Sequence, residues 1–179
     1  MASPLPHQGP ARSRDPYANS PFGWYGAEPA FLLRLERNLK HIPEPVTCIE
    51  GARELIYKVK DLAVCGDLEA HNLRIVFEPD PYLARHTGLP PCDYPCIYTD
   101  VDRPRKHNHA DTGLCLWEPS DPPERRWQHQ LGLHSLVELP RRHLFCELHW
   151  WRTGGARRGE WPVEDAPHGL PAARKRVRR

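Results

Sequence analysis

The hydrophobic pattern of the 179-residue chain predicts an α+β fold in which helices lie on one antiparallel sheet. Two observations support this prediction. A helical pattern comes first, alternating strand patterns follow, and helical patterns return after a long irregular loop. The connections between the strand patterns are short, which favours an antiparallel meander over a parallel sheet.

The N-terminal helix is predicted over residues 28–40. Pro29 suits its first turn, and Pro43 and Pro45 prevent its continuation. Residues at three- and four-residue spacing form its apolar face, namely Phe31, Leu32, Leu35 and Leu39.

Three strands are predicted, over residues 54–60, 73–77 and 96–101. Apolar and polar side chains alternate most clearly in the first, which indicates one buried and one exposed face. Pro79 and Pro81 end the second strand. The segment 103–127 has little periodicity and many prolines. We expect a long loop there, and long loops in compact domains are usually functional.

The C-terminal helices are predicted from Leu131 onward. Pro140 cannot occupy a helix interior but can begin a helix, so it is expected to start a second one. The apolar stripe of this second helix is expected to comprise Leu144, Leu148 and Trp151. Gly154 and Gly155 are expected to end it.

Composition divides the chain into three parts. Residues 1–27 read as a flexible Pro-rich arm, residues 28–169 as the folded domain and residues 170–179 as a basic disordered tail. The tail holds five basic and no acidic residues. The other 169 residues hold 20 basic against 23 acidic side chains, a formal net charge of −3. This charge argues against a nucleic-acid-binding domain.

No run of about 20 apolar residues and no signal-peptide pattern is present, so neither a membrane span nor secretion is indicated. The protein is therefore expected to be cytoplasmic. The six cysteines should then be reduced, which favours a nucleophile or a metal ligand over a disulfide framework.

The segment 106–117 is the candidate site, because Cys115 follows a turn-forming glycine there and a His-Asn-His cluster precedes it. A thiol is a suitable acyl carrier, since the thiolate is nucleophilic and the thioester stays reactive toward amines. The Asn108 amide can donate a hydrogen bond to the oxyanion of such a reaction. His107 or His109 can raise the thiolate fraction or orient the amide.

Two alternatives to a nucleophilic Cys115 remain open. A cysteine between two leucines is by default a small buried hydrophobic residue, which leaves a non-catalytic binding module. A zinc site is the other alternative. Its candidate ligands are Cys92, Cys96, His107, His109 and Cys115.

The order of motifs over residues 28–151 resembles the ubiquitin-conjugating enzymes. That family has a Tyr-Pro before a strand, a His-Pro-Asn motif, a Gly-Ile-Cys-Leu active site and a later Trp. The matching residues here are Tyr94-Pro95, His107-Asn108, Gly113-Leu114-Cys115-Leu116 and Trp127. Asn108 follows His107 directly, without the intervening proline. Thr153-Gly154, Gly159-Glu160-Trp161 and Ala166-Pro167-His168 look like segments of the prokaryotic members, which occur in antiphage defence operons.

The resemblance implies a ubiquitin-conjugating-like fold with Cys115 as the thioester carrier, Asn108 as the oxyanion donor and His107 beside it. It implies no cofactor. The implied partners are a ubiquitin-like modifier or a modified protein C-terminus, a separate activating enzyme and a target protein. Cyclic-oligonucleotide-based signalling is favoured as the setting over a stand-alone ubiquitin-like pathway, so the target can be a nucleotidyltransferase. Three acids near the cysteine, Asp111, Glu118 and Asp121, are left without an assigned role.

Overall fold

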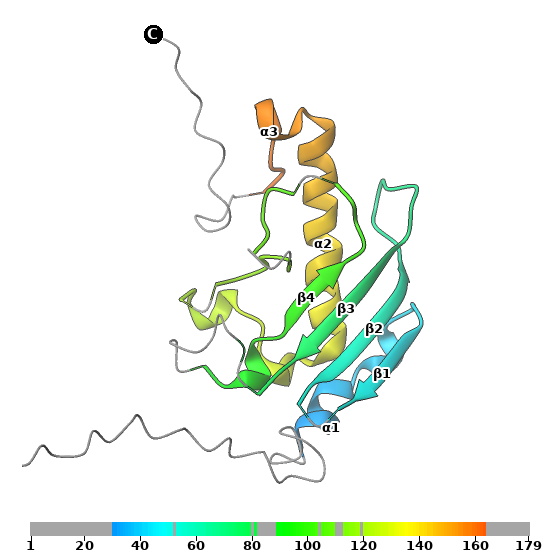
Figure 1. Cartoon of the computed structure of the whole chain (residues 1–179), viewed down its shortest axis with the longest axis vertical. Coiled ribbons are helices and arrows are strands. Elements are labelled where there is room, and N and C mark those ends of the chain that lie inside the picture. The colour runs from blue at the N-terminus through cyan, green and yellow to red at the C-terminus, as the bar shows by residue number, and fades with distance from the viewer. Residues whose placement is uncertain are drawn as a thin grey trace, which may run out of the picture.

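The computed structural model describes residues 30–51, 53–79, 81, 89–103, 105–109, 113–118 and 120–163. Its centre is a four-stranded antiparallel sheet in the order β1-β2-β3-β4. The strands are β1 (Val46–Glu50), β2 (Leu55–Leu62), β3 (His71–Phe77) and β4 (Cys96–Thr99). The helix α2 (Gly132–Arg152) runs along one face of this sheet, and α1 (Ala30–Glu36) lies near β1 and β2 (Figure 1). The α+β prediction with an antiparallel sheet is confirmed.

Short helices occupy the connections. They are η2 (Leu39–His41), η4 (Pro91–Asp93), η5 (Pro123–Arg125), η6 (His129–Leu131) and α3 (Gly155–Arg158). The connection from β4 to α2 matches the predicted long loop, since η5 and η6 are the only helices in its described part. No helix within the described residues is long and apolar enough to cross a membrane. The N-terminal arm and the basic tail lie outside the described residues.

The three predicted strands are present, with small shifts at their ends. In β2 the side chains of Leu55, Tyr57 and Val59 are fully buried, whereas Lys58 and Lys60 are exposed, as the alternation predicts. Sequence reasoning missed β1. Most of its side chains are exposed, so its letters carry no strong burial pattern, and its pairing with β2 defines it as a strand.

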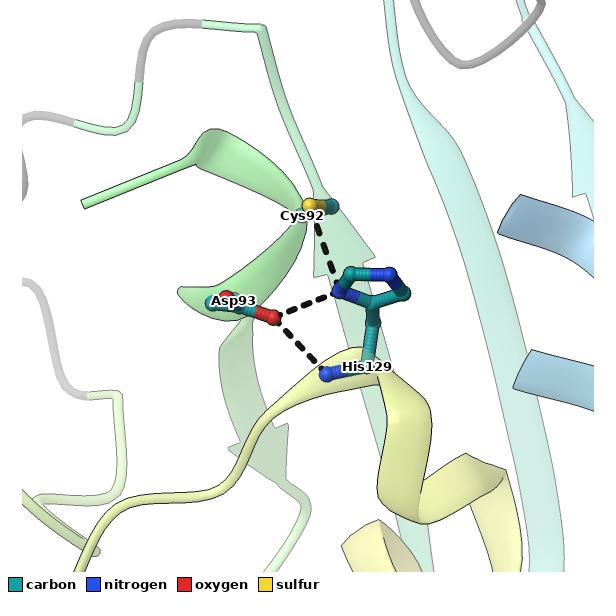
Figure 2. Close-up of side chains that lie close together, drawn as sticks. All are labelled: Cys92, Asp93 and His129. Carbon is teal, nitrogen blue, oxygen red and sulfur yellow. Dashed lines mark hydrogen bonds and ion pairs between the residues drawn. The ribbon is translucent and has the colours of Figure 1, made fainter. Parts of the chain in front are cut away.

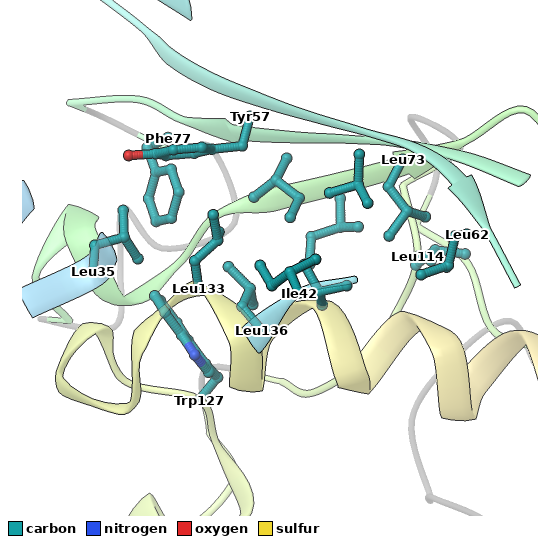
Figure 3. Close-up of a cluster of buried hydrophobic side chains, with 14 of the residues drawn as sticks. Leu35, Ile42, Tyr57, Leu62, Leu73, Phe77, Leu114, Trp127, Leu133 and Leu136 are labelled. Carbon is teal, nitrogen blue, oxygen red and sulfur yellow. The ribbon is translucent and has the colours of Figure 1, made fainter. Parts of the chain in front are cut away.

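The hydrophobic core lies between the sheet and α2 (Figure 3). Phe31 and Leu35 of α1 enter the core from one end, where Phe31 meets Phe77 edge-on at 5.8 Å between ring centroids. Trp127 is buried, and its indole nitrogen donates to the Gly132 carbonyl at 3.2 Å. Trp127 therefore packs in the core and joins the loop before α2 to the start of that helix.

Two predictions about the C-terminal helices are wrong. Pro140 does not begin a new helix, because it lies inside the continuous 21-residue helix α2. Pro140 removes one backbone hydrogen bond, but the helix buries apolar side chains against the core on both sides of it. Trp151 is 49% exposed and does not extend the buried stripe, whereas the neighbouring Trp150 is buried. The described part of the first helix is shorter than predicted and ends at Glu36.

Candidate active site

Cys115 lies on a short antiparallel hairpin beside β4. The His109 amide donates to the Gly113 carbonyl at 2.8 Å, and the Cys115 amide donates to the His107 carbonyl at 3.4 Å. The Leu114 amide donates to the Ile97 carbonyl of β4 at 2.7 Å, which attaches the cysteine-bearing segment to the sheet. The backbone therefore brings together the two parts of the candidate site that the sequence separates by several residues.

The register of this hairpin pairs Asn108 with Leu114. His107 is then opposite Cys115, and paired residues of an antiparallel ladder share one face. The ladder thus places the two histidines, rather than Asn108, on the face of Cys115. One amide hydrogen of Asn108 is used locally, because its Nδ2 donates to the His109 carbonyl at 3.1 Å.

The Cys115 thiol is buried, with 3% of the residue exposed. Its Sγ donates to Oε1 of Glu118 at a distance of 3.8 Å. Burial raises the pKa of the Cys115 thiol to about 12, and the negative charge and hydrogen bond of Glu118 and the charge of Asp121 add to this effect. The thiol is therefore protonated at neutral pH in this conformation.

His107 is also buried, and its ring meets the segment that follows α3. Its ring centroid lies 4.8 Å from that of Trp161 and 6.2 Å from that of His143 in α2. The Lys106 ammonium lies 5.3 Å from the Trp161 ring centroid. The Gly159-Glu160-Trp161 segment, noted in the sequence for its resemblance, thus covers the histidine of the candidate site.

A second cysteine–histidine–carboxylate group lies near the start of α2 (Figure 2). Nδ1 of His129 lies 2.8 Å from Oδ1 of Asp93 and 3.5 Å from Sγ of Cys92. The same Asp93 oxygen accepts the backbone amide of His129 at 2.8 Å. Both side chains approach the same ring nitrogen, so this is not a catalytic triad, in which the nucleophile and the carboxylate bind opposite nitrogens. The group ties η4 to η6.

The zinc prediction does not hold for the ligand set that the sequence suggested. Among the described residues, three of the five candidate ligands divide between two separate groups, and Cys96 and His107 belong to neither. Cys92 lies with Asp93 and His129. His109 and Cys115 lie with Glu118, and the candidate donor atoms of these three lie within 4.8 Å of one another. Sequence reasoning noted Glu118 only as one of three nearby acids, and it missed His129.

Comparison with protein-family models, with curated proteins and with solved structures finds no match to this chain. The functional conclusion therefore depends on the residues and their geometry.

Proposed function

We propose that this protein is a ubiquitin-conjugating-like transferase, which carries a ubiquitin-like modifier as a thioester on Cys115 and passes it to an amine. The observation that carries the proposal is the hairpin, because it pairs the His107-Asn108 segment with the Gly113–Cys115 segment, which is itself hydrogen-bonded to β4. The resemblance implies a helix, a strand meander, a long loop and a further helix in that order, and the structure has the same order.

The proposed chemistry needs a nucleophile and a hydrogen-bond donor for the oxyanion. The Cys115 sulfur attacks the carbonyl carbon of the incoming thioester, and the tetrahedral oxyanion accepts a hydrogen bond. Asn108 has a second amide hydrogen besides the one that it donates to the His109 carbonyl. A ring nitrogen of His109 lies within 4.8 Å of the Cys115 sulfur. Either of these residues can supply the donor, with His107 holding the opposing backbone.

Burial of the thiol adds a condition to this proposal. A protein C-terminus cannot reach the sulfur of a residue that is only 3% exposed, so binding of the modifier or of the activating enzyme has to open the hairpin region. A thiol that is protonated and covered in the free protein is protected from small oxidants and electrophiles, since the thiolate is the reactive form.

The proposed partners are a ubiquitin-like modifier or a modified protein C-terminus, a separate activating enzyme and a target with a reactive amine. The favoured setting is cytoplasmic antiphage defence of the cyclic-oligonucleotide type, in which the target is a nucleotidyltransferase. A stand-alone ubiquitin-like pathway is the second setting. The chain has no Gly-rich nucleotide loop, so activation of the modifier with ATP is assigned to the partner enzyme.

The test is to incubate the protein with the activating enzyme and modifier of its operon and ATP, and to measure intact mass with and without a reducing thiol. We expect a modifier adduct on the wild type that the thiol releases, and complete loss of this adduct in Cys115→Ala. Cys65→Ala is the matched control, because Cys65 is an exposed cysteine remote in sequence from the hairpin, and it should form the adduct normally. An adduct that persists in Cys115→Ala would refute the assignment.

A non-catalytic binding module is the second candidate, and the burial of Cys115 favours it. This candidate predicts no adduct under any partner combination. It also predicts that Cys115 stays unreactive toward alkylating agents when the modifier and activating enzyme are added. Labelling of Cys115 that increases on addition of these partners would count against it.

A further inference from the structure

Glu118 is held against the Cys115 thiol by a local turn. The Glu118 amide donates to Oδ2 of Asp121 at 2.9 Å, and the Asp121 amide donates to the Glu118 carbonyl at 2.9 Å. These reciprocal bonds fix the backbone of Glu118, and its side chain points back to Sγ three residues earlier. The contact with the thiol is therefore built into the chain that follows the nucleophile.

The groups around this thiol differ in what they contact. Asp121 is committed to the Glu118 amide through Oδ2. His107 has its ring against Trp161 and His143. His109 completes the group from the opposite strand, and its ring nitrogen lies within 4.8 Å of both Sγ and the Glu118 carboxylate.

We propose that Glu118 is a catalytic residue that accepts the Cys115 thiol proton as the sulfur attacks the modifier thioester. This proposal rests on the proposed thioester function. It assigns to Glu118 the proton transfer that a buried, protonated thiol requires before it can act as a nucleophile.

The proposed reaction balances in protons and electrons without another reactant. The S–H bond of Cys115 breaks, its proton moves to the Glu118 carboxylate, and the sulfur electron pair forms the new C–S bond to the modifier carbonyl carbon. The old C–S bond then breaks, and the cysteine of the activating enzyme leaves as a thiolate. In the second step an amine nitrogen attacks that carbon, and Cys115 leaves and regains a proton from Glu118 while the attacking amine releases one to solvent.

Glu118 affects the resting thiol and the transfer step in opposite directions. In the resting protein the Glu118 charge, after burial, helps to raise the pKa of the Cys115 thiol, so neutralising that charge increases the thiolate fraction. In the transfer step the same substitution removes the proton acceptor, and general-base catalysis contributes about 100-fold or more to a rate. A residue that acts only as a nearby charge would not produce this opposition of signs.

The test compares Glu118→Gln with Asp121→Asn. Each variant removes one negative charge near Cys115, and each new side chain keeps an oxygen that can accept a hydrogen bond. The Glu118 carboxylate accepts the thiol hydrogen bond, whereas the Asp121 carboxylate accepts the Glu118 amide. Two rates are measured for each, the single-turnover rate of thioester formation and the rate of Cys115 alkylation in the folded protein. Urea unfolding confirms that both variants are folded.

We expect Glu118→Gln to slow thioester formation by about 100-fold while its alkylation rate rises or stays constant. Asp121→Asn should slow thioester formation much less than Glu118→Gln, because it keeps the proton acceptor and an oxygen for the Glu118 amide. Equal or faster thioester formation in Glu118→Gln would overturn the proposal, as would equal slowing in both variants. Stoichiometric zinc in the wild type that is lost in Glu118→Gln would also overturn it, by making the three residues a metal site. Failure of the wild type to form any adduct would instead refute the proposed function itself.

Discussion

The molecule holds two groups made of the same three residue types, and their bonding differs. In the Cys92–Asp93–His129 group (Figure 2) the carboxylate binds both the ring and the backbone amide of the histidine, and the cysteine shares the same ring nitrogen. In the His109–Cys115–Glu118 group the carboxylate binds the thiol itself. The first arrangement uses its polar atoms to join two segments, whereas the second places a carboxylate directly against a thiol.

The two groups also occupy different positions in the fold. The first joins η4, which precedes β4, to η6, which precedes α2, and it packs against the core through the contact of His129 with Phe31 at 5.6 Å between ring centroids. The second lies on a hairpin attached to the sheet edge. Composition alone therefore does not identify a site, because the bond that each atom makes decides its role.

The largest expected difference concerns the reactivity of the thiols. Cys115 has a pKa raised to about 12 by burial and by Glu118 and Asp121, whereas an unperturbed thiol titrates near 8.5. At pH 8 its thiolate fraction should therefore be on the order of 1000-fold smaller than that of an unperturbed thiol. We expect alkylation of Cys115, followed by mass spectrometry, to keep accelerating above pH 10.

The control for this prediction is the same labelling in urea, where all six cysteines should react alike because burial is lost. A native labelling curve for Cys115 that levels off near pH 8 would contradict the structural assignment of a buried thiol bonded to a carboxylate.

The parts of the fold that follow from the sequence are those with a repeating burial pattern. The alternation in β2 and the apolar face that contains Phe31 and Leu35 were readable because each buries alternate or periodic side chains in one core. The edge strand β1 could not be predicted from the sequence, because it is a strand only through its backbone pairing with β2. Pro140 misled the prediction because local propensity favours a break there, and burial on both sides of it outweighs that preference.

The candidate site follows from the sequence only in part. The local order of residues indicated Cys115 and its neighbours, because the turn-forming glycine and the histidines lie close along the chain. The choice of Glu118 among three acids depends on a side-chain direction set by the Asp121 turn. The pairing of Asp93 with His129 spans 36 residues, so it depends on the packing of the folded chain and has no local signal.

The second expected difference concerns stability. His129→Ala removes a buried ring, its bond to a carboxylate and its contact with Phe31, so we expect a loss of about 3 kcal/mol in the free energy of unfolding. His109→Ala removes a half-buried ring from the hairpin and should cost less than about 1 kcal/mol. Urea unfolding of both variants measures the difference. Equal losses of unfolding free energy in the two variants would mean that the His129 group is no more important to stability than the His109 group.

The smallest expected effect concerns a third histidine–carboxylate group, formed by Asp67 and His71, which can be compared with the other two groups. Asp67 lies 2.9 Å from Nε2 of His71 and accepts a bond from Arg103 at 2.6 Å, with 10% of its side chain exposed. Burial alone would raise the pKa of Asp67, but the bonds from Arg103 and His71 outweigh it and lower the pKa well below the usual range. Like the Asp93 group, this carboxylate joins two connections, here the one between β2 and β3 and the one after β4.

A carboxyl whose pKa is lowered by folding stabilises the protein above its unfolded pKa of about 3.9, and that stabilisation is lost as the pH falls below this value. Asp67→Asn should therefore cost about 2 kcal/mol in the free energy of unfolding at pH 7, and the difference from the wild type should shrink steadily below pH 4. Urea unfolding across this pH range measures it, with the exposed neighbour Glu69→Gln as the control. A difference that does not change with pH would show that Asp67 contributes by packing rather than by its charge. Asp67 would then differ from Glu118, whose proposed role as a proton acceptor depends on its charge.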